Sequence, residues 1–498
     1  MINRTDMIDM IDRIDGASAD EVVSSVRALV DTGALSAGES LPPIRDLAGS
    51  LGLNRNTVAA AYAQLAAAGV VESRRRGGTV VLGVPDLARE GLAPSGLVDL
   101  SSGNPDPALL PGLAGALDAG YVPSLYGGSP VDPDLARWAG EHLAPDVDGE
   151  HRVVLAHGAV DAVERLLAAH LTRGDLVAVE DPCFLSNIGT LRLGGYRGGP
   201  VAVDDEGMCV AGLRDALGEG ARAVVCTPRA HNPTGVSLTP GRAAALRDVL
   251  AEHPDVLVVE DDHFSAVSTR AYLRITPPGA PRWALVRSVS KFLGPDLRLA
   301  FVLADTTTAA RLETRLSSST TWVSHVLQRV VAHVLAEPGT DALLDRARAT
   351  YARRSERLAA ALGERGIPVP GPGDGLNLWV PLPVPVSARQ VVDDLAARGW
   401  AVRAGDDFTL GAGHPPAIRV TTSTLDARQA VAFAADLAAI VRPRDTSGER
   451  PRGRNAPARA GTAADGERRI DERRIHERPA SRAGGGRAPG LDVQGAAS

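Results

Sequence analysis

The chain has 498 residues, which is more than one hydrophobic core supports, so we expect more than one domain. Its content of 44% hydrophobic and 23% charged residues is ordinary for a soluble globular protein. No apolar run is long enough to cross a bilayer. We therefore expect a cytoplasmic protein with no membrane partner. The three cysteines form neither a metal-ligand spacing nor a disulfide framework.

The formal net charge of −7 hides local excesses of positive charge. Residues 41–83 hold five arginines against two acidic residues, and residues 443–498 hold twelve arginines against eight acidic residues. A polyanion responds to local rather than to summed charge. The net charge therefore does not exclude a nucleic-acid partner.

The first part of the chain predicts a small domain. Residues 1–16 repeat an Ile-Asp unit, and we expect a disordered leader there. From residue 17 the apolar residues recur at helical spacing, and the turn-rich residues after Gly33 end this predicted helix. Proline and glycine punctuate residues 84–97, which predicts a linker. The small domain is therefore expected over residues 17–83.

Residues 41–81 have the pattern of a helix–turn–helix followed by a wing. A short apolar-faced helix ends at Gly52, which permits a tight turn, and Asn54 is a good N-cap for a second helix. Two short β runs then surround an Arg-Gly tip. In DNA-binding proteins of this shape the second helix enters the major groove and the wing contacts the backbone.

The pattern LPxxRxLAxxLGxxRxTVxxAYxxLxxxG, followed by GGT, resembles the winged helix–turn–helix of the GntR superfamily of bacterial transcription factors. The resemblance implies double-stranded operator DNA as a partner. A helical hairpin with a solvated arginine face is the alternative, and it is the ordinary explanation of any single arginine. The residues expected to contact DNA, with Asn56 added because it lies at the exposed start of the second helix, are Arg45, Arg55, Asn56, Thr57, Arg76 and Gly78.

After Val98 short β-branched runs alternate with helical stretches. This alternation is typical of an α/β domain whose largely parallel sheet is covered on both faces, and we expect that domain over residues 98–442. Residues 443–498 are rich in Arg, Pro, Gly and Ala with few large apolar residues, which predicts a disordered tail.

Lys291 is the only lysine among the 53 Lys and Arg residues of the chain. A lysine amine can lose its proton and form a Schiff base with a carbonyl compound, whereas arginine cannot. Arg298 follows seven residues later and can pair with a phosphate, and Ser288 and Ser290 offer hydroxyls to the same group. A chain that otherwise uses arginine for positive charge therefore places lysine where a neutral amine is useful.

Two polar residues near predicted strand ends suit an aromatic ligand. Asp261 ends a predicted strand, where doubly wound folds place ligand groups, and it can hold a pyridinium nitrogen protonated. Asn232 lies in an NPTG turn, positioned to bond a ring hydroxyl. Each residue alone has an ordinary structural explanation, as a cap or a turn residue.

Three further segments complete the pattern. The residues Gly158, Ala159 and Val160 present backbone N–H groups at a helix start, a natural anion cradle. Phe184 offers a flat face for a ring, although a lone phenylalanine is more often core packing. Arg419 can clamp a carboxylate bidentately.

Together these segments resemble the pyridoxal 5′-phosphate (PLP) fold-type I aminotransferases from about residue 99 to residue 441. The resemblance implies PLP as the cofactor and a multidomain fold class, a small α+β winged helix–turn–helix plus an α/β fold-type I aminotransferase-like domain. Arg419 matches the substrate-carboxylate arginine, and Tyr126 matches a tyrosine lent by the neighbouring subunit. The positions that match cofactor contacts are Lys291, Asp261, Asn232, Phe184, Arg298, Ser288, Ser290, Gly158, Ala159 and Val160.

Two positions depart from the family. His263 stands where the family usually has a tyrosine that reaches the ring hydroxyl, and a histidine can still donate a hydrogen bond there. Asp161 lies in the helix start where uncharged polar residues are common, and it would repel a phosphate if it pointed inward.

A GntR-type winged helix joined to an aminotransferase-like domain resembles the MocR subfamily of transcriptional regulators. The resemblance implies a regulator that senses an amino compound or PLP through the Lys291 Schiff base, modulates operator binding and forms a head-to-tail homodimer. One alternative is a working PLP-dependent aminotransferase with a DNA-binding domain. Another is a degenerate scaffold that binds DNA without a cofactor. The residues leave the effector, the operator and the sign of regulation open.

Overall fold

A computed structural model of the 498-residue chain describes residues 10–68, 70–74, 78–82, 90–91, 93–94, 96–117, 123–371, 373–411 and 413–441. The predictions for Arg76, for residues 84–89 of the linker and for the tail of residues 443–498 lie outside the described residues. Within the described part of the chain, no helix has both the length and the apolar character needed to cross a membrane.

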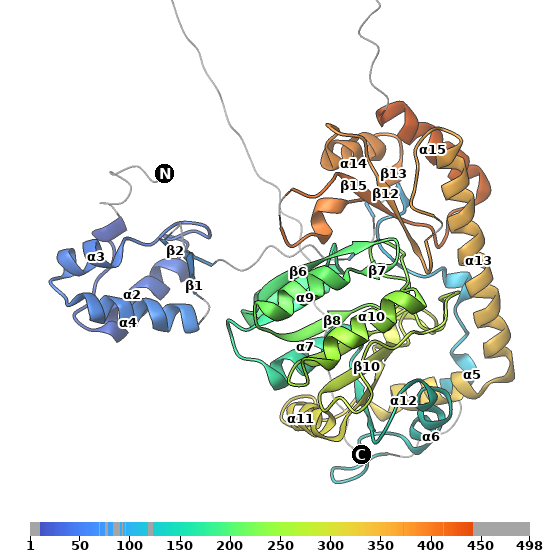
Figure 1. Cartoon of the computed structure of the whole chain (residues 1–498), viewed down its shortest axis with the longest axis horizontal. Coiled ribbons are helices and arrows are strands. Elements are labelled where there is room, and N and C mark those ends of the chain that lie inside the picture. Colours follow the sequence, from blue (N-terminus) through green and yellow to red (C-terminus); the bar gives the residue numbers. More distant parts are fainter. Residues whose placement is uncertain are drawn as a thin grey trace, which may run out of the picture. The chain divides into compact units, whose positions relative to one another are not determined.

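The described residues of the N-terminal part include the helices α2, α3 and α4 and a two-stranded antiparallel sheet, which confirms the predicted winged helix–turn–helix (Figure 1). Asn54 caps the second helix of the motif by accepting a hydrogen bond from the backbone N–H of Asn56 (2.9 Å). Gly52 has a φ of +67° at the end of the preceding helix. The elements are α2 (Ala19–Asp31), α3 (Ile44–Leu51), α4 (Arg55–Ala67), β1 (Val71–Arg74) and β2 (Gly78–Val81).

The hydrophobic core of this part extends into the predicted leader of residues 1–16. Met10 and Ile14 are buried in the same cluster as Val22 of α2. The prediction of disorder is therefore wrong for residues 10–16. The physical reason is that the leader carries apolar side chains four residues apart, a spacing that lets both contact one surface.

An eight-stranded, mostly parallel sheet forms the centre of the large domain, as the alternating pattern predicted. Its strand order is β4-β11-β10-β9-β8-β5-β6-β7, and β11 and β7 run antiparallel to their neighbours. The strands are β4 (Arg152–Ala156), β5 (Leu176–Asp181), β6 (Arg197–Asp204), β7 (Gly207–Met208), β8 (Ala221–Cys226), β9 (Leu257–Asp261), β10 (Trp283–Ser288) and β11 (Ala300–Ala304).

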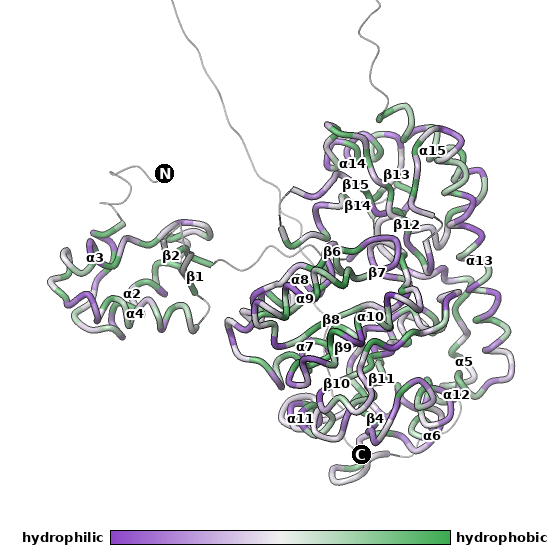
Figure 2. Tube along the Cα trace, viewed as in Figure 1, coloured by the Kyte–Doolittle hydropathy of each residue, from purple (hydrophilic) through white to green (hydrophobic). Residues whose placement is uncertain are grey.

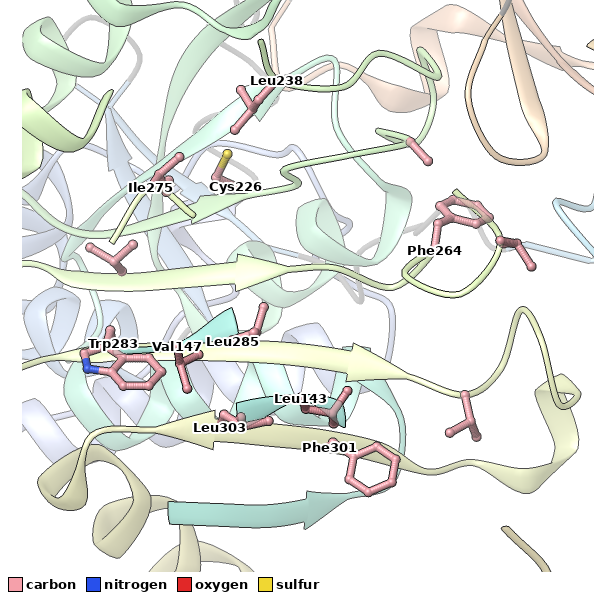
Figure 3. Close-up of a cluster of buried hydrophobic side chains, with 14 of the residues drawn as sticks. Leu143, Val147, Cys226, Leu238, Phe264, Ile275, Trp283, Leu285, Phe301 and Leu303 are labelled. Atoms are coloured by element: carbon pink, nitrogen blue, oxygen red, sulfur yellow. The ribbon is translucent and has the colours of Figure 1, made fainter. Parts of the chain in front are cut away.

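Helices cover both faces of this sheet. Neighbouring residues of β9 point to opposite faces, because Val258 packs in one core cluster and Val259 in the other. Figure 2 shows the central strands as largely hydrophobic, and Figure 3 shows Leu285 and Leu303 beside Leu143 in the first cluster. That cluster includes α6 (Pro133–His142), α9 (Val210–Gly218), α10 (Pro240–Ala251), α12 (His325–Ala336) and α13 (Pro338–Gly363), and the second includes α7 (Ala159–His170), α8 (Leu185–Gly194) and α11 (Thr306–Ser317).

Two smaller sheets, of strand order β12-β15-β14 and β13-β3, lie in the C-terminal part of the domain. Strand β3 (Val98–Asp99) pairs in parallel with β13 (Trp400–Ala401). Just after β3, the carbonyl oxygen of Leu100 accepts a hydrogen bond from the backbone N–H of Thr421 (2.8 Å). Residues 100–103 therefore lie against the strand that carries Arg419. The elements are β3 (Val98–Asp99), β12 (Asn377–Pro381), β13 (Trp400–Ala401), β14 (Arg403–Ala404), β15 (Ala417–Thr421), α14 (Ala388–Ala396) and α15 (Ala427–Val441).

Candidate functional site

The ends of neighbouring strands bring several predicted residues to one edge of the large sheet. Ser288, the last residue of β10, pairs with Ala300 of β11, and Ala300 pairs with Ala156 at the end of β4. Because α7 begins shortly after β4, its start lies beside the segment that connects β10 to β11.

Gly158 and Arg298 form a cradle at the start of α7. Gly158 has a φ of +94°, and a Cβ at that position would lie 3.0 Å from Nη2 of Arg298. Arg298 Nη2 also donates a hydrogen bond to the carbonyl oxygen of His157 (3.0 Å). Ala159 and Val160 are the first residues of α7, so their backbone N–H groups lack partners within the helix. The guanidinium and the helix start together present positive charge, as a phosphate requires.

The neighbouring side chains are compatible with an anion there. Ser288 is buried and its Oγ donates a hydrogen bond to Oγ of Ser290 (3.0 Å), so two hydroxyls are adjacent. Asp161 accepts hydrogen bonds from Nε of Arg165 (2.6 Å) and from the backbone N–H of His157 (3.0 Å). Arg165 therefore compensates the charge of Asp161, which reduces the repulsion that the sequence suggested.

Lys291 follows β10 in the same segment. Its Nζ donates a hydrogen bond to the carbonyl oxygen of Gly103 (2.7 Å) and lies 5.7 Å from the ring centroid of Phe264. Burial lowers the pKa of the Lys291 amine from 10.5 to about 8, while Glu90 raises it and Arg419 lowers it further. The amine is therefore partly neutral near physiological pH, as a nucleophile must be.

Asp261 is buried at the end of β9 with one oxygen unsatisfied. Oδ2 lies 3.2 Å from Nδ1 of His263, whereas Oδ1 has no hydrogen-bond partner among the described residues. A buried acceptor without a donor costs free energy. The N–H of a pyridinium ring would supply that donor, so this carboxylate fits PLP.

Phe184 and His263 present their rings to each other. The two ring centroids are 6.0 Å apart and the planes differ by 29°. A flat ligand that stacks between two rings requires the rings to be about 7 Å apart. A small outward movement of Phe184 and His263 would therefore make room for a flat ligand between them. His263 lies opposite Phe184, and its expected role in place of a tyrosine at the ring hydroxyl stays a prediction. Phe264, the next residue in the chain, is the aromatic side chain beside Lys291.

Arg419 on β15 is fully buried with both terminal nitrogens engaged. Nη1 donates hydrogen bonds to Oε1 of Glu90 (2.5 Å) and to Oδ1 of Asn232 (3.1 Å). Nη2 donates to Oε2 of Glu90 (3.0 Å) and to the carbonyl oxygen of Ser101. The guanidinium also lies 4.8 Å from the ring centroid of Phe408. The arginine clamps a carboxylate bidentately, and that carboxylate is Glu90 of this chain.

Asn232 is buried beside this clamp. Its Oδ1 accepts hydrogen bonds from Arg419 and from Nδ2 of Asn377 (3.3 Å). With the oxygen engaged, the amide Nδ2 of Asn232 is the group suited to donate to a ring hydroxyl. Sequence reasoning found Asn232 through its NPTG turn, but it missed Asn377, Gly103 and Glu90, for which no local motif exists.

Tyr126 does not join the cluster within one chain. Its side chain is 87% exposed, and its ring centroid lies 5.3 Å from that of Trp322.

The described residues that were predicted to contact DNA lie near the starts of two helices and of one strand. Arg45, near the start of α3, has a side chain that is 79% exposed. Arg55 and Asn56 are exposed in the first turn of α4, and Thr57 beside them is half-buried. Gly78 is exposed at the start of β2 with a φ of +72°. Exposed positive and polar groups therefore lie in the first turn of the helix that would enter a groove.

Two family models match the chain. The model of bacterial regulatory proteins of the gntR family matches residues 18–81, and that of aminotransferase class I and II matches residues 97–437. These matches agree with the two folds described above.

Two bacterial regulators and a solved aminotransferase structure are similar to much of the chain. The vitamin B6 salvage pathway transcriptional repressor PtsJ of Salmonella typhimurium is 48% identical over 430 residues, which cover 85% of this chain and 98% of PtsJ. The probable rhizopine catabolism regulatory protein MocR of Rhizobium meliloti is 26% identical, with 68% and 76% covered. The structure of a kynurenine aminotransferase from Pyrococcus horikoshii has a TM-score of 0.63 at 21% identity, with 70% and 91% covered, which shows the shared fold.

Proposed function

Because the chain belongs to the aminotransferase class I and II family, with PLP as its cofactor, and carries a GntR-family DNA-binding domain before it, we propose that it is a MocR-type regulator in which a ligand at Lys291 modulates operator binding. One observation carries the proposal. A single chain holds a helix start with exposed Arg55 and Asn56, and also a buried cluster with a partly neutral Lys291 beside an unsatisfied Asp261.

PLP itself is the signal that we favour, with an amino compound as the alternative. The support is the similarity to a vitamin B6 salvage repressor, which extends over nearly all of that protein. A ligand shifts a protein between states only by its difference in affinity for them. If PLP is the signal, it must therefore bind more tightly to one of two conformations that differ in their affinity for operator DNA.

The residues divide the work of holding PLP. Bound PLP supplies an aldehyde carbon that bonds covalently to a primary amine and a ring that withdraws electrons. Lys291 provides the amine, and the start of α7 with Arg298 holds the phosphate charge. Asp261 accepts the hydrogen bond of the ring N–H, Asn232 donates to the ring hydroxyl, and the rings of Phe184 and His263 cover its faces.

The assembly is a head-to-tail homodimer that binds paired half-sites. The exposed Tyr126 supports it, because a neighbouring subunit would cover this ring and receive it near its own cofactor. The protein acts in the cytoplasm, where a bacterial regulator meets its operator.

A working aminotransferase is the second candidate, and it is supported by the presence of Lys291, Asp261, Asn232 and Arg419 at positions that match that family. The two are separated by incubating PLP-loaded protein with amino donors and keto acids while following the cofactor spectrum. A regulator responds at most once per site and forms no product in excess of protein. Repeated formation of a new amino acid would show that the protein is an enzyme.

Uptake of PLP by cofactor-free protein will become faster as pH rises through about 8. The Lys291 amine is protonated and unreactive below its pKa of about 8 and neutral above it, so the rate rises about tenfold per pH unit below this value and then levels off. Stopped-flow absorbance, corrected for the ionisation of PLP itself, measures the profile. Because Glu90 raises the Lys291 pKa, Glu90→Gln will move the inflection to lower pH. An inflection near the ordinary value of 10.5 would contradict the buried environment.

A further inference from the structure

Glu90 occupies the position that a ligand carboxylate needs. Both of its oxygens accept hydrogen bonds from Arg419, at 2.5 and 3.0 Å, in the bidentate geometry that arginine offers to any carboxylate. A second arginine, Arg403, lies near the same group, with 3.9 Å between its Nε and Oε2 of Glu90. One guanidinium edge accommodates one bidentate carboxylate, so Glu90 and a ligand carboxylate cannot share Arg419 in this way.

Glu90 also lies close to the reactive lysine. A Cβ added at Gly103 would be 3.5 Å from Oε1 of Glu90 and 3.6 Å from both terminal nitrogens of Arg419. The carbonyl oxygen of the same Gly103 accepts the hydrogen bond from Lys291 Nζ. An amino acid places its amine and its carboxylate a short distance apart. An amino acid whose amine approaches Lys291 would therefore place its carboxylate at Arg419, where Glu90 is bound.

The rest of the described connecting segment follows the surface near the clamp. Gly91, Ala93, Pro94 and Leu97 line a groove of about 510 Å³ together with residues of α14 and β14, Arg403 among them. Glu90 thus reaches Arg419 from a segment that lies over this part of the domain. Arg419 is fully buried, so removing its partner would leave an uncompensated charge.

We propose that Glu90 is a built-in occupant of the Arg419 clamp that excludes amino-acid and keto-acid carboxylates. The site then keeps PLP beside Lys291 and the other aminotransferase-like residues without admitting the substrates of that reaction. Small amines without a carboxylate, and PLP itself, do not compete with Glu90. The exclusion of amino acids rests on the proposed function, whereas the occupation of the clamp does not.

Thermal unfolding of PLP-free protein tests the occupation of the clamp. Glu90→Ala leaves Arg419 without its carboxylate, so we expect a fall in Tm of about 5 °C. Millimolar acetate will restore at least about half of this loss by taking the vacated place, and acetamide, its neutral analogue, will restore none. Glu90→Gln keeps a hydrogen-bonding oxygen, and it replaces Glu90→Ala in the same test if Glu90→Ala does not fold. Acetate will stabilise this variant more than it stabilises the wild type.

Asp393→Asn is the matched control, because Asp393 is an exposed acid on α14 that lines the same groove. Acetate will shift the Tm of this control and of the wild type by the same small amount. An equal acetate shift in the Glu90 variants and in the wild type would overturn the proposal. The assay contains neither PLP nor DNA, so its outcome is independent of whether the protein is a PLP sensor.

The exclusion of carboxylates is tested with the PLP-loaded protein and two probes. L-alanine carries a carboxylate, and ethylamine is the same molecule without it. Titrations followed by the cofactor spectrum will show that Glu90→Gln binds L-alanine about tenfold more tightly than the wild type does and binds ethylamine within about twofold of it. Equal gains for both probes would mean that Glu90 blocks access in general, which contradicts a carboxylate-specific role.

Discussion

Replacing Lys291 by alanine will abolish the stable attachment of PLP to the protein. The covalent bond to the cofactor requires a primary amine, and the described cluster around Asp261 contains no other. Retention after gel filtration will fall from about one PLP per chain to a small fraction of that. Lys291→Arg will behave in the same way, because arginine keeps the charge but stays protonated. Absorbance spectra before and after desalting measure the loss.

The composition of the chain makes this test unusually direct. Lys291 is the only lysine, so borohydride reduction of the wild type, followed by peptide mass spectrometry, can mark one internal residue only. Burial disfavours the charged amine, so removing it will leave the Tm of PLP-free protein unchanged or raised. A Lys291→Ala protein that still retains PLP in equal proportion to chain would contradict the assignment.

Replacing Arg55 and Asn56 together by alanine will remove most of the affinity for operator DNA. Both side chains are exposed in the first turn of α4, where a recognition helix meets base edges and phosphates. A base contact contributes about 1–3 kcal/mol, so we expect the affinity to fall at least about tenfold. A lost phosphate contact also reduces, by about one, the slope of the logarithm of affinity against the logarithm of salt concentration. Fluorescence anisotropy with the protein's own promoter region, at several salt concentrations, measures both quantities.

Arg27→Ala serves as the control for this pair, because Arg27 is an exposed arginine of the same domain on α2. Its affinity for the operator should stay within about twofold of the wild type. If the control and the double variant lose affinity equally, net charge rather than the start of α4 governs binding.

Residues whose place follows from a nearby strand or helix end could be found in the sequence. Asp261 is the last residue of β9, and Gly158 directly precedes α7, so each is fixed by an element that has its own periodic pattern. The composition singled out Lys291. The general physics of doubly wound sheets then brings these positions to one edge.

Contacts between distant segments could not be found in this way. Glu90 and Arg419 are 329 residues apart, and an acid in a linker has no feature that marks it as a partner for a buried arginine. The contact of Phe264 with Lys291 also escaped prediction, because the turn after β9 decides which side chain faces the amine. The burial of Ile14 escaped for the same reason, since most of the cluster that buries it lies outside the leader.

The affinity for operator DNA with and without PLP, at one fixed salt concentration, tests the central claim most directly. We expect PLP to change the operator affinity of the wild type by about tenfold, and to leave that of Lys291→Ala unchanged, because only the wild type can hold PLP covalently. An equal response of both proteins to PLP, or no response of the wild type, would contradict a regulator that senses its ligand at Lys291.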